Sequence, residues 1–130
     1  ELTLNIEENI FIKSRKERIV EIFSNLISNA IRYNKDEGKL YIEISKDDVP
    51  KIIVEDTGIG ISKENMGRVF DRFYTVDTSH SGIGGGFGLG LAIVKKLAQK
   101  AGWKINLTSE VNKGTKFEII FYGNKKCIKE

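Results

Sequence analysis

The sequence is poor in the residues that mark secreted, membrane-spanning or fibrous proteins: its 130 residues include one cysteine, one proline and one histidine. Cys127 has no second cysteine with which to pair, so it fits a reducing compartment and suggests no role of its own. No apolar run approaches the ~20 residues that a membrane-spanning helix needs. The polar start, without an initiator methionine, is unlike a signal peptide and suggests a piece of a longer protein.

Charge and length set further bounds. The formal net charge is only +3, which is too small an excess to predict a nucleic-acid-binding face, because such a face needs clustered basic residues. With 40% hydrophobic and 30% charged residues, the composition is ordinary for a globular protein. A chain of this length fits one domain, so we expect residues 1–130 to form a single unit.

Apolar periodicity predicts a mixture of strands and helices. Alternating or largely apolar runs predict strands at residues 2–6, 10–12, 40–45, 51–55, 104–108 and 116–121. Helical spacing predicts helices at residues 14–33 and 89–101, and the weakly periodic segment between them has room for a short helix at 62–69. Ser14 and Glu17 resemble a capping box at the start of the first helix, and Gly102 is well placed to end the last one. Because parallel βαβ repetition is absent, this order fits a two-layer α/β sandwich with helices on one face of the sheet.

Two asparagines lie four residues apart on the first predicted helix. Asn25 and Asn29, joined by Arg32, stack on the side roughly opposite the apolar stripe centred on Leu26 and Ala30. A polar side that faces solvent is the simpler interpretation of these residues alone. The alternative is a site for Mg²⁺, which prefers oxygen, takes few protein ligands and completes its shell with phosphate oxygens and water.

An aspartate and two glycines follow directly after an apolar predicted strand. Gly58 and Gly60 would let the backbone turn and approach a ligand closely, although a surface turn is the simpler interpretation. An ionised Asp56 only accepts hydrogen bonds. It can therefore pair with the exocyclic amine of adenine, whereas it repels the carbonyl oxygen that guanine carries at that position. Such a site would prefer ATP to GTP by rejecting the wrong base.

Glycine is concentrated between residues 82 and 90. Each glycine makes ordering costlier by roughly 0.5–1 kcal/mol relative to alanine, so we expect this loop to be mobile until a ligand holds it. The stretch matches neither of the usual phosphate-binding glycine patterns, and a flexible linker is the simpler interpretation. The apolar helix predicted directly after it favours a hinged lid, with a helix N-terminus near Leu89 that suits phosphate oxygens.

Taken in order, these patterns resemble the catalytic ATP-binding domain of sensor histidine kinases, within the larger family shared with DNA gyrase, the Hsp90 chaperones and the MutL mismatch-repair proteins. The resemblance covers essentially the whole chain. It rests on an N box at residues 25–33, a first glycine box at 56–61, an F box at 69–74, a second glycine box at 86–93 and the family's usual ending at 109–117. It implies a Bergerat fold: a mixed, mostly antiparallel sheet covered on one face by about three helices, with a mobile ATP lid.

The resemblance also implies roles for individual residues. Asn29 would coordinate Mg²⁺, and Asn25 beside it would support the phosphates. Asp56 would bind the adenine amine, and Thr115 would lie near the adenine through a water. The other positions implied for nucleotide binding, of which the two phenylalanines would anchor the lid or pack in the core, are Arg32, Tyr33, Gly58, Gly60, Ile61, Phe70, Phe73, Gly86, Gly88, Leu89, Gly90 and Leu91.

The sequence departs from the family pattern at three positions. Arg32 stands where the family usually has lysine, and its guanidinium would face phosphate with a different geometry. Thr75 stands where many members have an arginine that is a candidate γ-phosphate contact, while Arg72 remains close by as a candidate catalytic cation. Trp103 stands where glycine is common, and we interpret it as a packing residue.

The identity of residue 25 indicates whether a member of this family transfers phosphate to a protein or hydrolyses ATP. Relatives that hydrolyse ATP carry a glutamate general base there, and an amide cannot take a proton from water at neutral pH. Asn25 therefore favours transfer to another acceptor over hydrolysis, by positioning and electrostatics. The acceptor histidine of this family lies on a separate helical hairpin, and the only histidine here, His80, is interpreted as an exposed loop residue.

The resemblance thus predicts a protein histidine kinase domain with ATP and Mg²⁺ as its cofactors. Its partners would be the phosphoacceptor hairpin of the same kinase and a response regulator, without nucleic acid or direct membrane contact. We expect an isolated domain that is monomeric and cytoplasmic, from a homodimeric and membrane-anchored parent. The alternatives are a serine kinase of the anti-sigma-factor type, which shares the fold, and a non-catalytic module that binds only a partner or a nucleotide.

Overall fold

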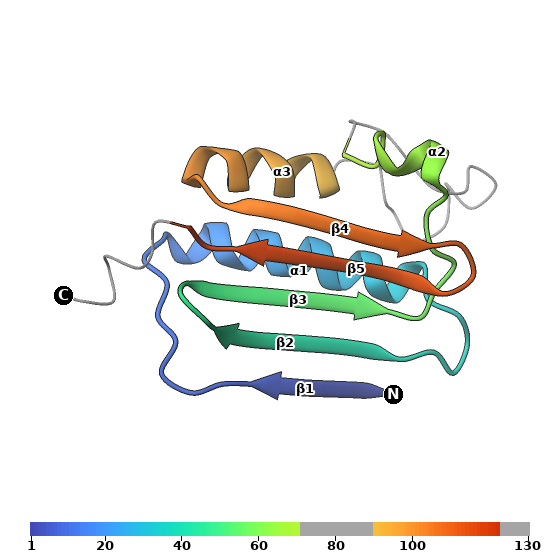
Figure 1. Cartoon of the computed structure of the whole chain (residues 1–130), viewed down its shortest axis with the longest axis horizontal. Helices are drawn as coiled ribbons and strands as arrows, with labels where there is room; N and C mark the ends of the chain where they lie inside the picture. Colours follow the sequence, from blue (N-terminus) through green and yellow to red (C-terminus); the bar gives the residue numbers. More distant parts are fainter. Residues whose placement is uncertain (71–89, 123–130) are drawn as a thin grey trace.

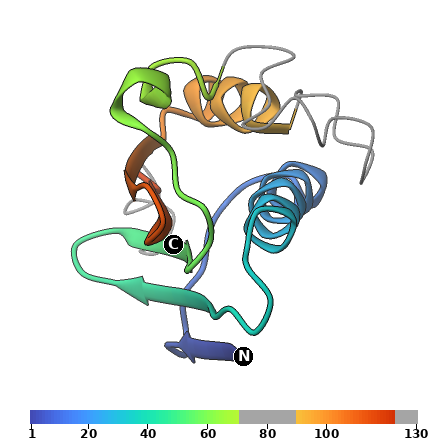
Figure 2. The same cartoon turned by 90° about the vertical axis from the view of Figure 1, so that its right-hand side faces the viewer.

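The computed structural model describes residues 1–70 and 90–122. Its elements are β1 (Leu2–Ile6), α1 (Lys16–Arg32), β2 (Leu40–Lys46), β3 (Pro50–Asp56), α2 (Lys63–Met66), α3 (Gly90–Ala101), β4 (Lys104–Glu110) and β5 (Gly114–Ile120). The strands form one sheet in the order β1-β2-β3-β5-β4, in which β1 and β2 are parallel and the other pairs are antiparallel. α1 and α3 pack on one face, and α2 lies beside β4 at the edge (Figure 1, Figure 2). The predicted two-layer α/β sandwich is confirmed.

The core lies between the sheet and the two long helices. Its residues alternate along the strands and recur every three or four positions along the helices, as the sequence pattern predicts. They are Ile22, Leu26, Ala30, Ile52, Val54, Val94, Ala98, Trp103, Phe117, Ile119 and Phe121. Full burial of each large apolar side chain contributes about 1.5–3 kcal/mol, so this periodicity decides which face of each element is covered. Within the described ranges, no helix is both long and apolar enough to cross a membrane.

The end of α3 is fixed by glycine, as predicted. Gly102 has φ 79°, and its N–H donates to the Gln99 carbonyl at 3.2 Å. The next N–H, of Trp103, donates to the Ala98 carbonyl at 2.9 Å, which completes a Schellman motif. The buried Trp103 then packs edge to face on Phe121, with ring centroids 4.5 Å apart. The interpretation of Trp103 as a packing residue is confirmed.

The strand predicted at residues 10–12 is wrong. The ladder between β1 and β2 stops at Ile6 and Ile44, and the last hydrogen bond is the one that the Glu7 N–H donates to the Ile44 carbonyl at 2.9 Å. Beyond this point the chain leaves the sheet to reach α1. Alternation in residues 10–12 therefore has no neighbouring strand to pair with.

The capping box predicted from Ser14 and Glu17 is also wrong. The N-cap of α1 is Arg15, whose side chain makes no capping hydrogen bond. Its carbonyl oxygen instead accepts the N–H groups of Arg18 and Ile19 at 3.1 and 3.3 Å. Among the residues that the structure describes, the buried Ser14 hydroxyl has no hydrogen-bond partner, because the helix begins one residue later than the box requires.

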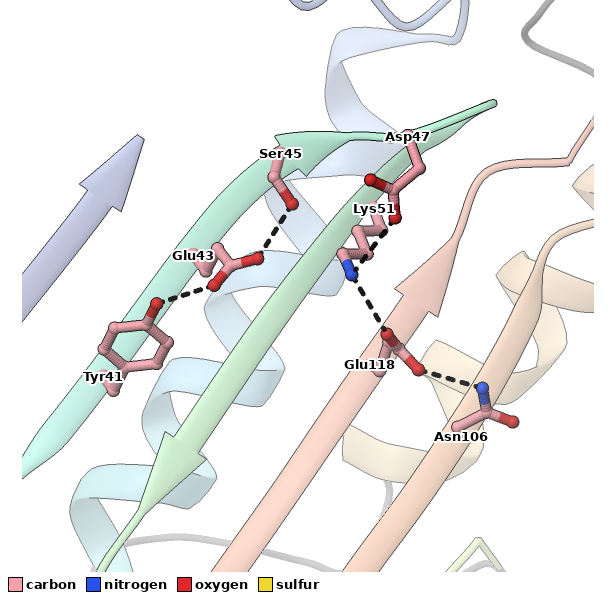
Figure 3. A network of polar contacts seen from close by, with 7 residues as sticks. All are labelled: Tyr41, Glu43, Ser45, Asp47, Lys51, Asn106 and Glu118. Atoms are coloured by element: carbon pink, nitrogen blue, oxygen red, sulfur yellow. Dashed lines mark hydrogen bonds and ion pairs between the residues drawn. The ribbon is translucent and has the colours of Figure 1, made fainter. Parts of the chain in front are cut away.

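The opposite face of the sheet is polar. Figure 3 shows two groups of polar contacts there: Tyr41 and Ser45 bond to Glu43, and Lys51 pairs with Asp47 and with Glu118, which also accepts from Asn106. The Tyr41 hydroxyl donates to Glu43 at 2.6 Å and the Ser45 hydroxyl at 2.8 Å, and these two bonds hold the pKa of the Glu43 carboxyl below its ordinary value. Because this face is polar, a single helical layer suffices, and the predicted site residues lie on the helical side.

Candidate functional site

The predicted adenine-binding residues lie in one row across the sheet. Asp56, the last residue of β3, is the cross-strand partner of Thr115 on β5, and Thr115 is in turn the partner of Ser109 on β4. Side chains directly opposite each other in an antiparallel pair project from the same face. Asp56 and Thr115 are each 8% exposed, and they are the buried polar residues of the described chain. The sheet therefore buries a carboxyl and a hydroxyl side by side.

Burial dominates the electrostatics of Asp56. Desolvation raises the pKa of its carboxyl above the ordinary value, and the negative charge of Glu55 adds to this effect. Hydrogen bonds from the backbone of Gly58 and Thr115 act in the opposite direction, and the Gly58 N–H lies 2.8 Å from Oδ1. The carboxyl is thus a desolvated acceptor that gains from any further donor, such as a ligand amine.

The loop after Asp56 is held against the end of α1. The Ile59 N–H donates to the Tyr33 carbonyl at 3.0 Å. A Cβ atom on Gly58 would lie 2.1 Å from that same oxygen and 2.9 Å from Cα of Asn34. The close approach that the sequence predicted for Gly58 is therefore made to the protein's own backbone, which ties the Asp56 loop to α1.

The same loop is held on its other side by the turn between β4 and β5. The Asn112 N–H donates to the Ile59 carbonyl at 2.8 Å. Gly60 has φ 74°, and a Cβ atom there would lie 2.1 Å from the Glu110 carbonyl oxygen. The next residue, Ile61, is 7% exposed and donates its N–H to Ser109 Oγ at 2.7 Å. Glycine is required at position 60 for both conformation and space.

The asparagine side of α1 faces the start of α3. The Asn25 side-chain nitrogen donates to the Glu21 carbonyl at 2.8 Å. Its carbonyl oxygen is turned toward Gly90, because a Cβ atom on Gly90 would lie 2.7 Å from Oδ1. Asn29, one turn later, is half-buried, and within the described residues its side chain makes no hydrogen bond. The amide oxygen of Asn29 is thus left available for a ligand.

The remaining described site residues flank this region. The exposed Arg32 guanidinium lies 5.8 Å from the centroid of the Tyr33 ring, within the range of a cation–π contact. Phe70 is half-buried with its ring edge against Phe117 at 6.3 Å, and the Lys95 ammonium lies 5.6 Å from its centroid. Leu91 packs against the core. Phe70 and Leu91 therefore serve packing here.

These parts meet at one end of the molecule. The C-terminal ends of α1 and β3, the turn between β4 and β5 and the N-terminal end of α3 all point the same way (Figure 1). The predicted lid and the predicted residues Arg72, Phe73, Gly86, Gly88 and Leu89 lie outside the described residues, as do Thr75 and His80.

The sequence did not predict a set of hydrogen bonds that supports the Asp56 loop. Asn34 Oδ1 accepts the Thr57 hydroxyl at 3.1 Å, and Asn34 Nδ2 donates to the Lys39 carbonyl at 2.9 Å. Thr57 Oγ1 also accepts the Lys39 N–H at 2.7 Å. The sequence gives no local signal for this role of Asn34, because Thr57 lies 23 residues away and only folding brings it close.

Ser109 was also missed as a functional residue, although a signal for it exists. It follows Ile105 and Leu107 at the inward positions of β4, so strand periodicity places its hydroxyl on the helical side. The structure joins this hydroxyl to Ile61, Gly114 and Thr115 at 2.7, 2.8 and 2.9 Å.

Comparison with known proteins identifies the family. Residues 14–123 match the family described as histidine kinase-, DNA gyrase B-, and HSP90-like ATPase. The chain belongs to this family. Its relatives include the signal transduction histidine-protein kinase ArlS of Staphylococcus aureus strain USA300, which is 43% identical over 115 residues, or 88% of this chain and 26% of ArlS. The chain thus spans about a quarter of the length of the curated relatives that it matches.

Solved structures of this family share the fold. The mycobacterial sensor histidine kinase MprB superposes with a TM-score of 0.81 at 23% identity, over 93% of this chain and 82% of that one. The catalytic domain of the histidine kinase ThkA gives 0.77 at 26% identity, over 93% and 77%. Full-length ShkA in complex with AMPPNP gives 0.77 at 27% identity, over 93% and 25%. Within the family, the chain is an ATP-binding catalytic domain of a two-component sensor histidine kinase.

Proposed function

We propose that this domain binds Mg-ATP and transfers the γ-phosphoryl group to a histidine on a separate helical hairpin of the same kinase, for relay to a response-regulator aspartate. The observation that carries the proposal is the buried pair Asp56 and Thr115, one a desolvated acceptor and the other a hydroxyl, with the Asp56 loop held against the C-terminal end of α1. The solved structure of full-length ShkA in complex with AMPPNP, an ATP analogue, supports ATP as the nucleotide.

Asp56 would select the base. Its carboxyl is buried and already accepts the Gly58 N–H at one oxygen, so a donor from adenine would complete its hydrogen bonding. Guanine would instead bring a carbonyl oxygen against a buried carboxylate, and leaving both acceptors unpaired costs about 1–3 kcal/mol or more. The burial of Asp56 thus favours ATP over GTP.

Asn29 would hold the metal. Within residues 1–70 and 90–122 there is no cluster of three or more His, Cys, Asp or Glu side chains that could bind a metal ion. Mg²⁺ does not need one, because it is commonly bound through one or two protein oxygens with phosphates and water. The half-buried Asn29 amide, without a hydrogen bond in the described chain, fits this requirement. When bound, the ion would supply positive charge to the phosphates.

Asn25 and the start of α3 would lie beside the phosphates. The Asn25 oxygen faces Gly90, so the N box and the second glycine box meet at this point. Free N–H groups at a helix N-terminus favour anionic groups. As an amide, Asn25 would position phosphate without acting as a base, which favours transfer to histidine over hydrolysis. Arg32 and Tyr33 remain proposed contacts near the C-terminal end of α1, and Arg72 remains a proposed contact from the sequence alone.

The other candidate functions are less well supported. The relatives ArlS and ThkA are histidine kinases by name, whereas a serine kinase of the anti-sigma-factor type has no specific observation in its favour. A module that binds only a protein partner would not need the Asn29 amide or the buried Asp56, and the Mg²⁺ dependence of binding separates the kinase from a module that binds a nucleotide without catalysis. We further propose that residues 1–130 are the catalytic domain of a membrane-anchored, homodimeric parent, with the domain itself monomeric and in the cytoplasm.

Titration with a fluorescent ATP analogue, with and without Mg²⁺, tests the proposal. We expect binding that Mg²⁺ strengthens in the unsubstituted chain and in Asn106→Ala, a control on the polar face of the sheet. Asn29→Ala should remove the Mg²⁺ dependence. Binding that ignores Mg²⁺ and is unchanged in Asn29→Ala would favour the non-catalytic alternative.

A further inference from the structure

Ser109 lies at the outer end of the row that contains Asp56 and Thr115. Its hydroxyl takes part in three hydrogen bonds, of which it can donate only one. Its Oγ lies 2.7 Å from the Ile61 N, 2.8 Å from the Gly114 carbonyl oxygen and 2.9 Å from Thr115 Oγ1. A serine hydroxyl has one proton and two lone pairs. These three contacts therefore restrict where each proton can be.

The proton arrangement follows from the partners. Ile61 N–H can only donate, so it takes one Ser109 lone pair. The Gly114 carbonyl can only accept, so a contact of 2.8 Å needs the single Ser109 proton. The bond to Thr115 must then use the Thr115 proton, donated to the second lone pair of Ser109. The reverse arrangement would leave the oxygens of Ser109 and Gly114 facing each other with no proton between them.

This arrangement leaves the Thr115 hydroxyl with lone pairs only. Its oxygen is then an acceptor next to the Asp56 carboxyl, its cross-strand partner, and both groups are buried. The exocyclic amine of adenine carries two N–H donors, whereas the corresponding group of guanine is an acceptor. Two neighbouring acceptors can take both amine protons, directly or through a water.

We propose that Ser109 is a specificity-determining positioning residue: by taking the Thr115 proton, it fixes the Thr115 hydroxyl as an acceptor, so that the site offers two acceptors to the adenine amine. The proposal rests on the proposed ATP binding and deepens it. Ser109 does not touch the base in this account. It acts through Thr115, and through Ile61 it also ties the Asp56 loop to β4.

A double-mutant cycle on affinity tests the proposal with two probes, ATP and purine riboside triphosphate, which lacks the amine. Ser109→Ala should weaken ATP binding by about fivefold, the effect of one hydrogen bond. It should also lower the ratio of the affinity for ATP to the affinity for purine riboside triphosphate. In a Thr115→Val background, Ser109→Ala should have no further effect on that ratio. Ser109→Thr, which keeps the hydroxyl, should restore both values, and Thr108→Ala, on the exposed side of the same strand, is the control.

Other outcomes separate this proposal from the one on which it rests. Ser109→Ala could lower the ATP affinity equally with and without the Thr115 hydroxyl, or it could leave the ratio of the two affinities unchanged. Either result would overturn the role of Ser109 while leaving ATP binding established. Absence of ATP binding by the unsubstituted chain would overturn both. Thermal unfolding checks that each variant is folded. Ser109→Cys, which keeps the volume and weakens the hydrogen bonds, replaces Ser109→Ala in the cycle if the alanine variant does not fold.

Discussion

The side-chain oxygen of Asn25 faces Gly90 so closely that a Cβ atom at Gly90 would lie 2.7 Å from it. This contact joins the asparagine helix α1 to the first residue of α3, two elements between which the sequence places β2, β3 and α2. The neighbouring atom is the end of a side chain, so substitution at Gly90 displaces the Asn25 amide before it displaces backbone.

Gly90→Ala should therefore couple to Asn25. In an Asn25→Ala background, alanine at position 90 should stabilise the domain by up to about 1 kcal/mol, the ordinary gain of alanine over glycine in a helix. With Asn25 present, the gain should be cancelled or reversed by the displaced amide. Urea denaturation of the four proteins of this cycle measures the coupling, which we expect at about 0.5–1.5 kcal/mol. Strictly additive effects would show that the contact is absent.

Gly58→Ala should be far more damaging than Gly67→Ala. A methyl group at position 58 would lie 2.1 Å from the Tyr33 carbonyl oxygen, which is backbone and cannot rotate away. We expect a loss of more than about 2 kcal/mol in the free energy of unfolding. Gly67 has no atom within 4 Å of a built Cβ, and its substitution should stay within about 0.5 kcal/mol. Equal stabilities of the two variants would mean that the Asp56 loop is not held against α1.

The elements with one covered face could be predicted from the sequence. The periodicity around Leu26 and Val54 placed α1 and β3 within a few residues, because burial on one face imposes it directly. The pairing order β1-β2-β3-β5-β4 could not be predicted, since it depends on contacts between distant segments. The strand at residues 10–12 failed for the same reason: local alternation does not say whether a partner strand is present.

The candidate site was predictable where a residue type carries the chemistry. Asp56 and Asn29 could be proposed from their chemistry, since a carboxylate accepts only and an amide oxygen suits Mg²⁺. The residues that support Asp56 could not be predicted in this way. Asn34 acts through Thr57 and the Lys39 backbone, and Ser109 acts through Thr115, and only the folded chain brings these groups together.

Asp56→Asn should change the pH dependence of stability. Burial raises the pKa of the Asp56 carboxyl above 3.8, so the folded state keeps this proton to higher pH than the unfolded state does. As the pH rises through 3.8 to the folded pKa, the unfolded chain ionises first, and the free energy of unfolding falls. The Asp56→Asn variant has no carboxyl at this position to ionise, so its stability does not fall in this way.

The stability of the asparagine variant relative to the unsubstituted domain should therefore increase as the pH rises from about 3.8, the ordinary pKa of the group. Denaturation over a series of pH values measures this difference. Asp36→Asn, at an exposed turn, controls for the loss of one carboxylate. A difference that is constant with pH, or that falls, would contradict the raised pKa.

The same variant should relax base selection. An asparagine at position 56 can donate as well as accept, so it no longer rejects a guanine carbonyl. We expect ATP affinity to fall about 10- to 100-fold, the loss of a hydrogen bond to a charged group, with a much smaller change for GTP. Competition of both nucleotides against a fluorescent analogue gives the ratio. An unchanged preference for ATP would place the adenine contact elsewhere.

Phosphoryl transfer in trans tests the central claim most directly. The domain is mixed with the phosphoacceptor hairpin of the same kinase, Mg²⁺ and γ-labelled ATP, and the hairpin is assayed for phosphohistidine. We predict label on a hairpin histidine that requires Mg²⁺, is lost in Asn29→Ala and persists in Asn106→Ala. Tight ATP binding with no labelled phosphohistidine would contradict the account.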